Sequence, residues 1–255
     1  MIIDTHTHIT SEELLPERQN ILEQMKVGNP AYLFEAGSRI SDIEDILEIV
    51  NEDNIFAYVG VHPHYVEEGD NYQRIIDVAK SNKKIVGIGE IGLDYHYDFK
   101  PRELQQKKFK EQIEIASSLN LPIILHIREA YQDSLKILND MKRYLQKGLY
   151  MHCYSGSKEL VSDYKKLGAV FGFAGVITFK KANKEDIIRE VGLDYIFSET
   201  DAPYLTPEPF RGRVNKPEYV KYVVEKYAQI FEKNQPYIES KIKDNVNRFF
   251  GGVIK

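Results

Sequence analysis

The stretch MIIDTHTH, residues 1–8, runs from a short apolar segment directly into alternating threonines and histidines. Its isoleucines and threonines are β-branched, which predicts a strand. In an open, doubly wound sheet the first strand is followed by a glycine-rich phosphate loop, and this stretch contains no glycine. It therefore favours an α/β fold of the (β/α)8 TIM-barrel type, in which active sites lie at the C-terminal ends of the strands. The open sheet is the alternative.

Seven further apolar runs follow, with amphipathic helical patterns between them. Such alternation indicates a parallel sheet, and eight units in 255 residues match the size of one closed barrel. We therefore predict a single domain over residues 1–255, with Ser41 as a candidate N-cap of its second helix. The predicted strands are 1–8, 31–38, 55–64, 84–93, 122–129, 148–155, 169–178 and 195–201. The predicted helices are 14–26, 41–52, 71–81, 102–119, 131–146, 157–167, 184–191, 216–233 and 235–249.

The composition is that of a globular protein, with 42% hydrophobic residues, 29% charged residues and a net charge of −5. Proteins that coat long duplexes are usually basic, so this class is disfavoured, and short or single-stranded nucleic-acid ends fit the charge better. The single cysteine, Cys153, excludes an internal disulfide and fits a reducing compartment. We see no signal peptide, no membrane span and no sign of an obligate protein partner, and we expect a cytoplasmic protein.

Six of the seven histidines fall at or near the C-terminal ends of predicted strands. His6 and His8 lie two residues apart on one strand, so their side chains share a face and are suited to binding a cation. A histidine taken by itself is more often a hydrogen-bonded core residue or a polar strand end. Their gathering at the end of the strands where barrel sites form favours a metal site. The six are His6, His8, His62, His64, His126 and His152.

Two carboxylates end predicted strands in the same way. Glu90 lies in the segment GIGEIG, residues 87–92, whose glycines allow close approach of neighbouring backbones. Asp201 lies in the segment SETDAP, residues 198–203. An ion pair with an arginine would explain Glu90 equally well in isolation, and a turn cap would explain Asp201. Among histidines at a barrel mouth, both are better explained as metal ligands, and the two oxygens of Glu90 suit it to bridging two ions.

Seven segments in order, spanning residues 4–217, resemble the TatD family of metal-dependent hydrolases within the amidohydrolase-like barrels. The resemblance implies six metal ligands and activity as a deoxyribonuclease, 3′-5′ exonuclease-like, or a related phosphodiesterase. Val214 departs from the pattern, because a basic residue is expected there. The segments are DTHTH (4–8), GVHPH (60–64), GIGEIGLDY (87–95), PIILHIR (122–128), HCYSG (152–156), ETDAPY (199–204) and RGRVNKP (211–217). The implied ligands are His6, His8, Glu90, His126, His152 and Asp201.

The mechanism expected from this set is hydrolysis of a phosphate ester by water activated by two divalent metal ions. One ion is held by His6, His8 and Asp201, the other by His126 and His152, and Glu90 binds both. The catalytic residues are Glu90 and Asp201, and Asp201 accepts the proton of the attacking water. Expected substrate contacts are Arg128 as a phosphate clamp, together with His62, Arg211 and Arg213. Nitrogen and oxygen ligands suit Zn, Mn, Fe, Co or Ni, and the resemblance adds Mg.

The sequence is also compatible with two other functions. The same activated water could attack a carbonyl carbon, as in a deaminase, a lactonase or another amidohydrolase acting on a C–N or ester bond. Glu90 argues against this alternative, because many such relatives bridge their metals with a modified lysine. The third hypothesis is a barrel that binds metal or a partner without turnover. A complete ligand set beside an arginine argues against it.

Overall fold

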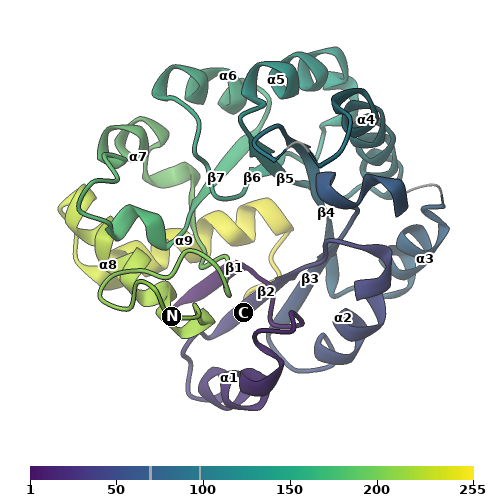
Figure 1. Cartoon of the computed structure of the whole chain (residues 1–255). Helices are drawn as coiled ribbons and strands as arrows, with labels where there is room; N and C mark the ends of the chain where they lie inside the picture. The colour runs from purple at the N-terminus through teal and green to yellow at the C-terminus, as the bar shows by residue number, and fades with distance from the viewer. Residues whose placement is uncertain (69–70, 98) are drawn as a thin grey trace. The chain divides into compact units, whose positions relative to one another are not determined.

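The computed structural model describes residues 1–68, 71–97 and 99–255. Within these residues eight strands alternate with nine α-helices, as Figure 1 shows by the change of colour along the chain. The strands are β1 (Ile3–Thr7), β2 (Tyr32–Ala36), β3 (Ile55–Val59), β4 (Ile85–Asp94), β5 (Ile123–Arg128), β6 (Leu149–Met151), β7 (Ala169–Phe173) and β8 (Ile196–Ser198). The helices are α1 (Arg18–Lys26), α2 (Ile43–Ile49), α3 (Gln73–Ser81), α4 (Arg102–Leu119), α5 (Tyr131–Asp140), α6 (Val161–Lys166), α7 (Glu185–Val191), α8 (Val220–Phe231) and α9 (Gln235–Phe250).

The strands of the described residues form one sheet in the sequential order β1 to β8. The pairs β1–β2, β3–β4, β4–β5, β5–β6 and β7–β8 are parallel. Thr7 at the end of β1 also forms a parallel bridge with Ala202, four residues beyond the end of β8. A (β/α)8 barrel has this topology: a parallel sheet in sequential order, in which the first strand is also joined to the segment that follows the last strand. The predicted fold class is therefore confirmed.

The chain divides by its internal contacts into two compact units. Unit 1 contains Met1–Glu35, Glu52–Ile55 and Phe171–Lys255, and unit 2 contains Ala36–Asn51 and Phe56–Val170. The division does not test the expectation of a single domain over residues 1–255, which stays a prediction. We describe the two units separately.

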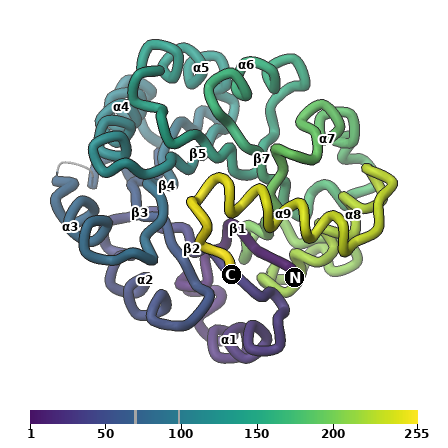
Figure 2. The backbone as a smooth tube through the Cα atoms, turned by 180° about the vertical axis from the view of Figure 1, so that it is seen from behind, coloured from purple at the N-terminus to yellow at the C-terminus, as the bar shows by residue number. Residues whose placement is uncertain are grey.

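The C-terminal helix closes the core of unit 1. Figure 2 shows α9 running past β1 and beside α8. The ring of Phe250, from the end of α9, lies 5.0 Å from that of Phe34 on β2 and 6.0 Å from that of Phe197 on β8. The helix begins where Asn234 accepts a hydrogen bond from the backbone of Tyr237, an N-cap. Burial of these aromatic rings holds the C-terminal segment against the strands that carry the site.

Helix α4 covers β4, the longest strand of unit 2, which is buried along its whole length. Phe109, Ile113 and Ala116 recur at helical spacing, and all three are buried. Two glutamines on the same helix are buried as well. Gln105 accepts a hydrogen bond from the backbone N–H of Asp94 at 2.8 Å, and Gln112 accepts one from Val61 at 2.7 Å. The helix thus holds the ends of β3 and β4 in place by polar contacts as well as by burial.

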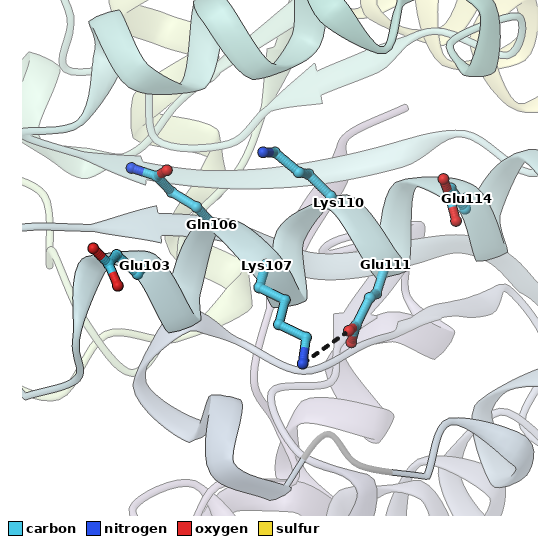
Figure 3. Close-up of a pocket in the computed structure, with 6 residues that line it drawn as sticks. All are labelled: Glu103, Gln106, Lys107, Lys110, Glu111 and Glu114. Carbon is cyan, nitrogen blue, oxygen red and sulfur yellow. Dashed lines mark ion pairs between the residues drawn. The ribbon is translucent and has the colours of Figure 1, made fainter.

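The outer face of α4 is polar. Figure 3 shows a shallow depression on this face, where Lys107 Nζ lies 3.9 Å from a carboxylate oxygen of Glu111. None of the residues predicted to bind metal or substrate lines it. The lining residues are Glu103, Gln106, Lys107, Lys110, Glu111 and Glu114.

Several strands end earlier than their apolar runs predict. β3 ends at Val59, β6 at Met151 and β8 at Ser198, so the polar residues that follow lie in turns and loops rather than on strands. Ser41 is not an N-cap: it lies within a 3-10 turn, Ile40–Asp42, and the α-helix begins at Ile43. The carboxylate of Asp42 accepts hydrogen bonds from the backbone N–H groups of Ser38 and Arg39, which accounts for the start of the helix at Ile43. Among the described residues, no helix has the length and apolar character needed to cross a membrane.

Candidate metal-binding site

Three predicted ligands come together in unit 1, and we call them the first donor set: His6, His8 and Asp201. Nε2 of His8 lies 3.4 Å from Oδ1 of Asp201, and Nε2 of His6 lies 3.8 Å from the same oxygen. The His6 side chain is fully buried, whereas His8 and Asp201 are slightly exposed. The backbone also joins the two segments, because Asp201 N donates to His6 O at 2.9 Å and His8 N donates to Ala202 O at 2.8 Å.

Asp4 and Thr200 position the turn that carries Asp201. The buried carboxylate of Asp4 accepts hydrogen bonds from Thr200 N at 2.9 Å and Thr200 Oγ1 at 2.6 Å. Burial raises the pKa of Asp4 well above its ordinary value, although the hydrogen bonds from Thr200 lower it. Asp201 then adopts φ 56°, in the left-handed region that aspartate tolerates better than most residues. Asp201 lies beyond the regular alternation of the strand, because β8 ends at Ser198.

Two further buried polar residues hold the loops around the first donor set. Glu35, at the end of β2, accepts hydrogen bonds from the backbone of Ile9 at 2.8 Å and Thr10 at 3.0 Å, which fixes the chain after His8. Burial raises the pKa of Glu35, while the nearby His8 lowers it. Asn215 donates to Thr200 O at 2.9 Å, so the loop that follows residue 211 is joined to the segment before Asp201.

The other three predicted ligands come together in unit 2, and we call them the second donor set: Glu90, His126 and His152. Oε2 of Glu90 lies 3.1 Å from Nε2 of His152 and 3.6 Å from Nδ1 of His126. Glu90 is almost fully buried at 3% exposure, and its other oxygen, Oε1, lies 3.5 Å from Ser38 Oγ. Donors about 2.1 Å from one ion in tetrahedral geometry stand roughly 3.0–3.6 Å apart, so this spacing fits shared coordination.

Glycines next to Glu90 are required by the packing of its neighbours. A Cβ on Gly89 would lie 2.6 Å from Cβ of Ile124 and 2.7 Å from its carbonyl oxygen. A Cβ on Gly92 would lie 2.1 Å from the carbonyl oxygen of His126, and Gly92 has φ +144°, which side chains rarely adopt. The close approach expected from the glycine-rich segment is therefore present, and it sets Glu90 beside the strand that carries His126.

Asp94 orients two histidines at the end of β4. Its Oδ2 lies 3.0 Å from Nε2 of His126 and 2.9 Å from Nε2 of His64, and its Oδ1 accepts a hydrogen bond from the backbone of His96 at 3.0 Å. Burial raises the pKa of Asp94, but the hydrogen bonds from His126 and His64 outweigh it and hold the pKa far below its ordinary value. An ionised carboxylate only accepts, so Nε2 of His126 carries a proton. Burial lowers the pKa of His126, but its hydrogen bonds with Asp94 and Glu90 outweigh burial and raise the pKa above its ordinary value. Nδ1 faces Glu90, and loss of the proton from this nitrogen would let it bind a cation.

His62 has the opposite orientation. The backbone N–H of His64 donates to Nδ1 of His62 at 3.1 Å, so the neutral ring carries its proton on Nε2. Burial lowers the pKa of His62 well below its ordinary value, and the neighbouring His126 lowers it further. The two rings lie 4.2 Å apart. Although donor atoms of His62, Glu90 and His126 lie within 4.8 Å of one another, this neutral N–H suits His62 to donating a hydrogen bond rather than to binding metal.

The predicted substrate-binding arginines lie in different surroundings. The guanidinium of Arg128, at the end of β5, lies 4.8 Å from the ring centre of Tyr97 in unit 2. In unit 1 the guanidinium of Arg211 lies 4.3 Å from the ring of Phe179, and that of Arg213 lies 5.6 Å from Phe210. Both Arg211 and Arg213 are exposed. Their contact with substrate stays a prediction.

Each half of the expected ligand set is thus assembled within its own unit. Several residues that support these ligands were not predicted from the sequence. Asp94 carried the clearest signal, because it stands four residues after Glu90 and directly follows the predicted strand 84–93, so continued alternation places it on the same face. Glu35, Thr200 and Ser38 gave no such signal. His96 pairs with Glu129 at 2.6 Å on the surface.

Comparisons with known proteins show what the chain is similar to over its whole length. A sequence model of the family described as TatD related DNase matches residues 3–251. The uncharacterized metal-dependent hydrolase YabD of Bacillus subtilis is 36% identical over 253 residues, covering 98% of this chain and 99% of that protein. The uncharacterized metal-dependent hydrolase YcfH of Escherichia coli K12 is 30% identical over 256 residues, covering 98% and 95%. Among solved structures, the TatD homologue YJJV of Escherichia coli K12 superposes with a TM-score of 0.91 at 25% identity, covering 98% of both chains.

Proposed function

This chain belongs to the TatD-related DNase family of metal-dependent hydrolases, and we propose that it hydrolyses phosphodiester bonds at nucleic-acid ends, using two divalent metal ions. The observation that carries the proposal is the second donor set. There an ionised Asp94 turns Nδ1 of His126 toward Glu90 Oε2, 3.6 Å away, beside His152. Such a carboxylate behind a histidine ligand is typical of a metal site.

The donor chemistry fits divalent cations. The first donor set, His6, His8 and Asp201, offers two imidazoles and a carboxylate to one ion. The second donor set offers two imidazoles and the carboxylate of Glu90, and we propose that Glu90 is shared by both ions. These mixed nitrogen and oxygen donors suit Zn, Mn, Fe, Co or Ni, while Mg would rely mainly on the carboxylates.

The residues of the chain have separate tasks in the proposed reaction. Divalent ions supply Lewis acidity and lower the pKa of water. Asp201 accepts the proton of the attacking water. His62, neutral and with its proton on Nε2, donates a hydrogen bond to a phosphate oxygen. Arg128 offers paired donors to the same phosphate.

Arg211 and Arg213 are proposed to attract the nucleic-acid substrate rather than to take part in the hydrolysis. Both are exposed, and each lies over an aromatic ring that restricts it. The loop that carries them is joined to the segment before Asp201 through Asn215. Positive charge at this loop would raise the local concentration of an anionic substrate in a protein whose net charge is −5.

The proposal is tested by assaying the purified protein against single-stranded DNA with a labelled 5′ end, with and without each divalent metal. The expected result is metal-dependent shortening from the 3′ end, lost in the Glu90→Ala variant. A parallel panel of amides and lactones tests hydrolysis of carbonyl compounds. Turnover of that panel without DNA cleavage would overturn the phosphodiesterase assignment, and absence of any turnover with every metal would overturn the catalytic one.

A further inference from the structure

Two aromatic rings lie exposed just beyond the end of β4. Tyr97 is 40% exposed and Phe99 is 61% exposed. Their rings are stacked, with centroids 5.0 Å apart and planes at 6° to each other. Large apolar surface of this kind is usually buried in a soluble domain unless it contacts a ligand or partner.

A cation continues the stack. The guanidinium of Arg128 lies 4.8 Å from the ring centre of Tyr97. Among residues 1–68, 71–97 and 99–255, no carboxylate forms an ion pair with Arg128. We call Tyr97, Phe99 and Arg128 the aromatic platform.

One imidazole separates the aromatic platform from the second donor set. His64 lies edge-on to Tyr97 at 5.6 Å and to Phe99 at 5.1 Å. The same His64 shares the carboxylate of Asp94 with His126. Because Asp94 is fully buried and held by the backbone of His96, the distance between platform and donor set is set by rigid contacts.

We propose that the aromatic platform binds a nucleobase of the substrate strand, next to the phosphate that Arg128 contacts. This inference rests on the proposed function and adds to it a base-stacking contact with the substrate strand. Every base has a π-face, so stacking on an aromatic ring binds single strands with little sequence preference. A base inside a duplex is already stacked and paired, so the platform would favour unpaired ends.

The chain contains no tryptophan, which allows a direct binding test. Phe99→Trp introduces one fluorophore at the platform. In EDTA, which prevents metal-dependent turnover, short oligothymidylate should shift and quench its emission. An oligomer of the same length made of abasic sugar phosphate should not. Equal responses to the two oligomers would overturn base stacking.

Turnover provides the second test. Phe99→Leu should raise KM for single-stranded DNA about 5- to 150-fold, the range for loss of one stacked base, with kcat nearly unchanged. Phe99→Tyr should restore KM, because it restores the ring. Tyr237→Leu is the matched control, since Tyr237 is 43% exposed on α9 in unit 1, and its KM should equal that of the wild type.

The outcomes separate the inference from the proposed function. If wild-type protein shortens DNA but cleaves abasic and base-bearing 3′ ends with equal KM, the platform assignment is wrong and the phosphodiesterase stands. If wild-type protein cleaves neither, the proposed function fails. The fluorescence titration then still decides whether the platform binds a base.

Discussion

Asp94 Oδ2 lies 3.0 Å from Nε2 of His126, and this contact decides which nitrogen of the histidine faces Glu90. A carboxylate behind a metal-ligating histidine fixes the tautomer and the orientation of the ring. In Asp94→Asn, either the amide NH2 faces His126 and makes Nε2 an acceptor, or it faces the backbone N–H of His96. We expect metal affinity to fall about 10- to 100-fold.

The measurement is chelator competition, together with the 15N shifts of the His126 ring, which report its tautomer. Asp133→Asn is the matched control, because Asp133 accepts from Tyr95 at 2.9 Å and not from a predicted ligand. Unchanged affinity and an unchanged His126 tautomer in Asp94→Asn would show that the contact does not set the ligand.

Glu90→Ala should remove both bound metal and hydrolysis, because it deletes the carboxylate that lies between the predicted ligands His126 and His152. The fold should stay largely intact. Activity should fall by more than about 100-fold, beyond the effect of outer-shell partners. Elemental analysis counts the ions. Loss of both ions supports a Glu90 shared between them. Loss of a single ion assigns Glu90 to the second donor set alone. Glu103→Ala, on the outer face of α4, is the control, and full turnover in Glu90→Ala would refute the role.

Gly89→Ala should disturb the site through packing. The added Cβ would lie 2.6 Å from Cβ of Ile124, which forces the strands apart and costs about 1–3 kcal/mol of stability. Because Glu90 is the next residue, metal affinity should fall as well. Gly192→Ala is the control: it is strained by φ +76° but meets no atom within 4 Å. Urea unfolding should show that both variants are less stable than the wild type. Chelator competition should show weaker metal binding in Gly89→Ala only. Equal metal affinity in the two variants would contradict this prediction.

Tyr131 should make the protein sensitive to alkali. Burial raises the pKa of Tyr131 from 10.0 to about 12, although hydrogen bonds with Ser155 lower it. A pKa that is higher in the folded state contributes stability that is complete below pH 10 and is lost as the pH rises toward 12.

Tyr131→Phe removes this dependence together with the 2.8 Å hydrogen bond to Ser155. Wild type should be more stable near pH 8 by about 1 kcal/mol. Its free energy of unfolding should then fall by about 1–2 kcal/mol relative to the variant between pH 10 and 11.5. Urea titrations at each pH measure the difference, and Tyr237→Phe is the exposed control. A constant difference across this range would exclude the effect.

Local pattern was sufficient for much of the fold. The spacing of Phe109, Ile113 and Ala116 predicts a helix over 102–119, and α4 has those bounds. Seven of the eight predicted strands contain the observed one, and β4 runs one residue beyond the predicted range 84–93. The ends were less predictable, because an apolar run continues into buried loops: Val61 is buried although β3 ends at Val59.

The sequence by itself determined the eight β/α units and the types of the predicted ligands, because strand alternation and strand ends are local properties of the chain. It placed His6 beside His8 through their spacing of two. The tertiary structure decided which nitrogen of His126 faces Glu90 and why Asp201 stands in a left-handed turn. Those outcomes depend on Asp94 and Asp4, whose partners lie 32 and 196 residues away in the chain. Contacts between segments so distant arise only when parallel strands bring their ends together, and no local pattern encodes them.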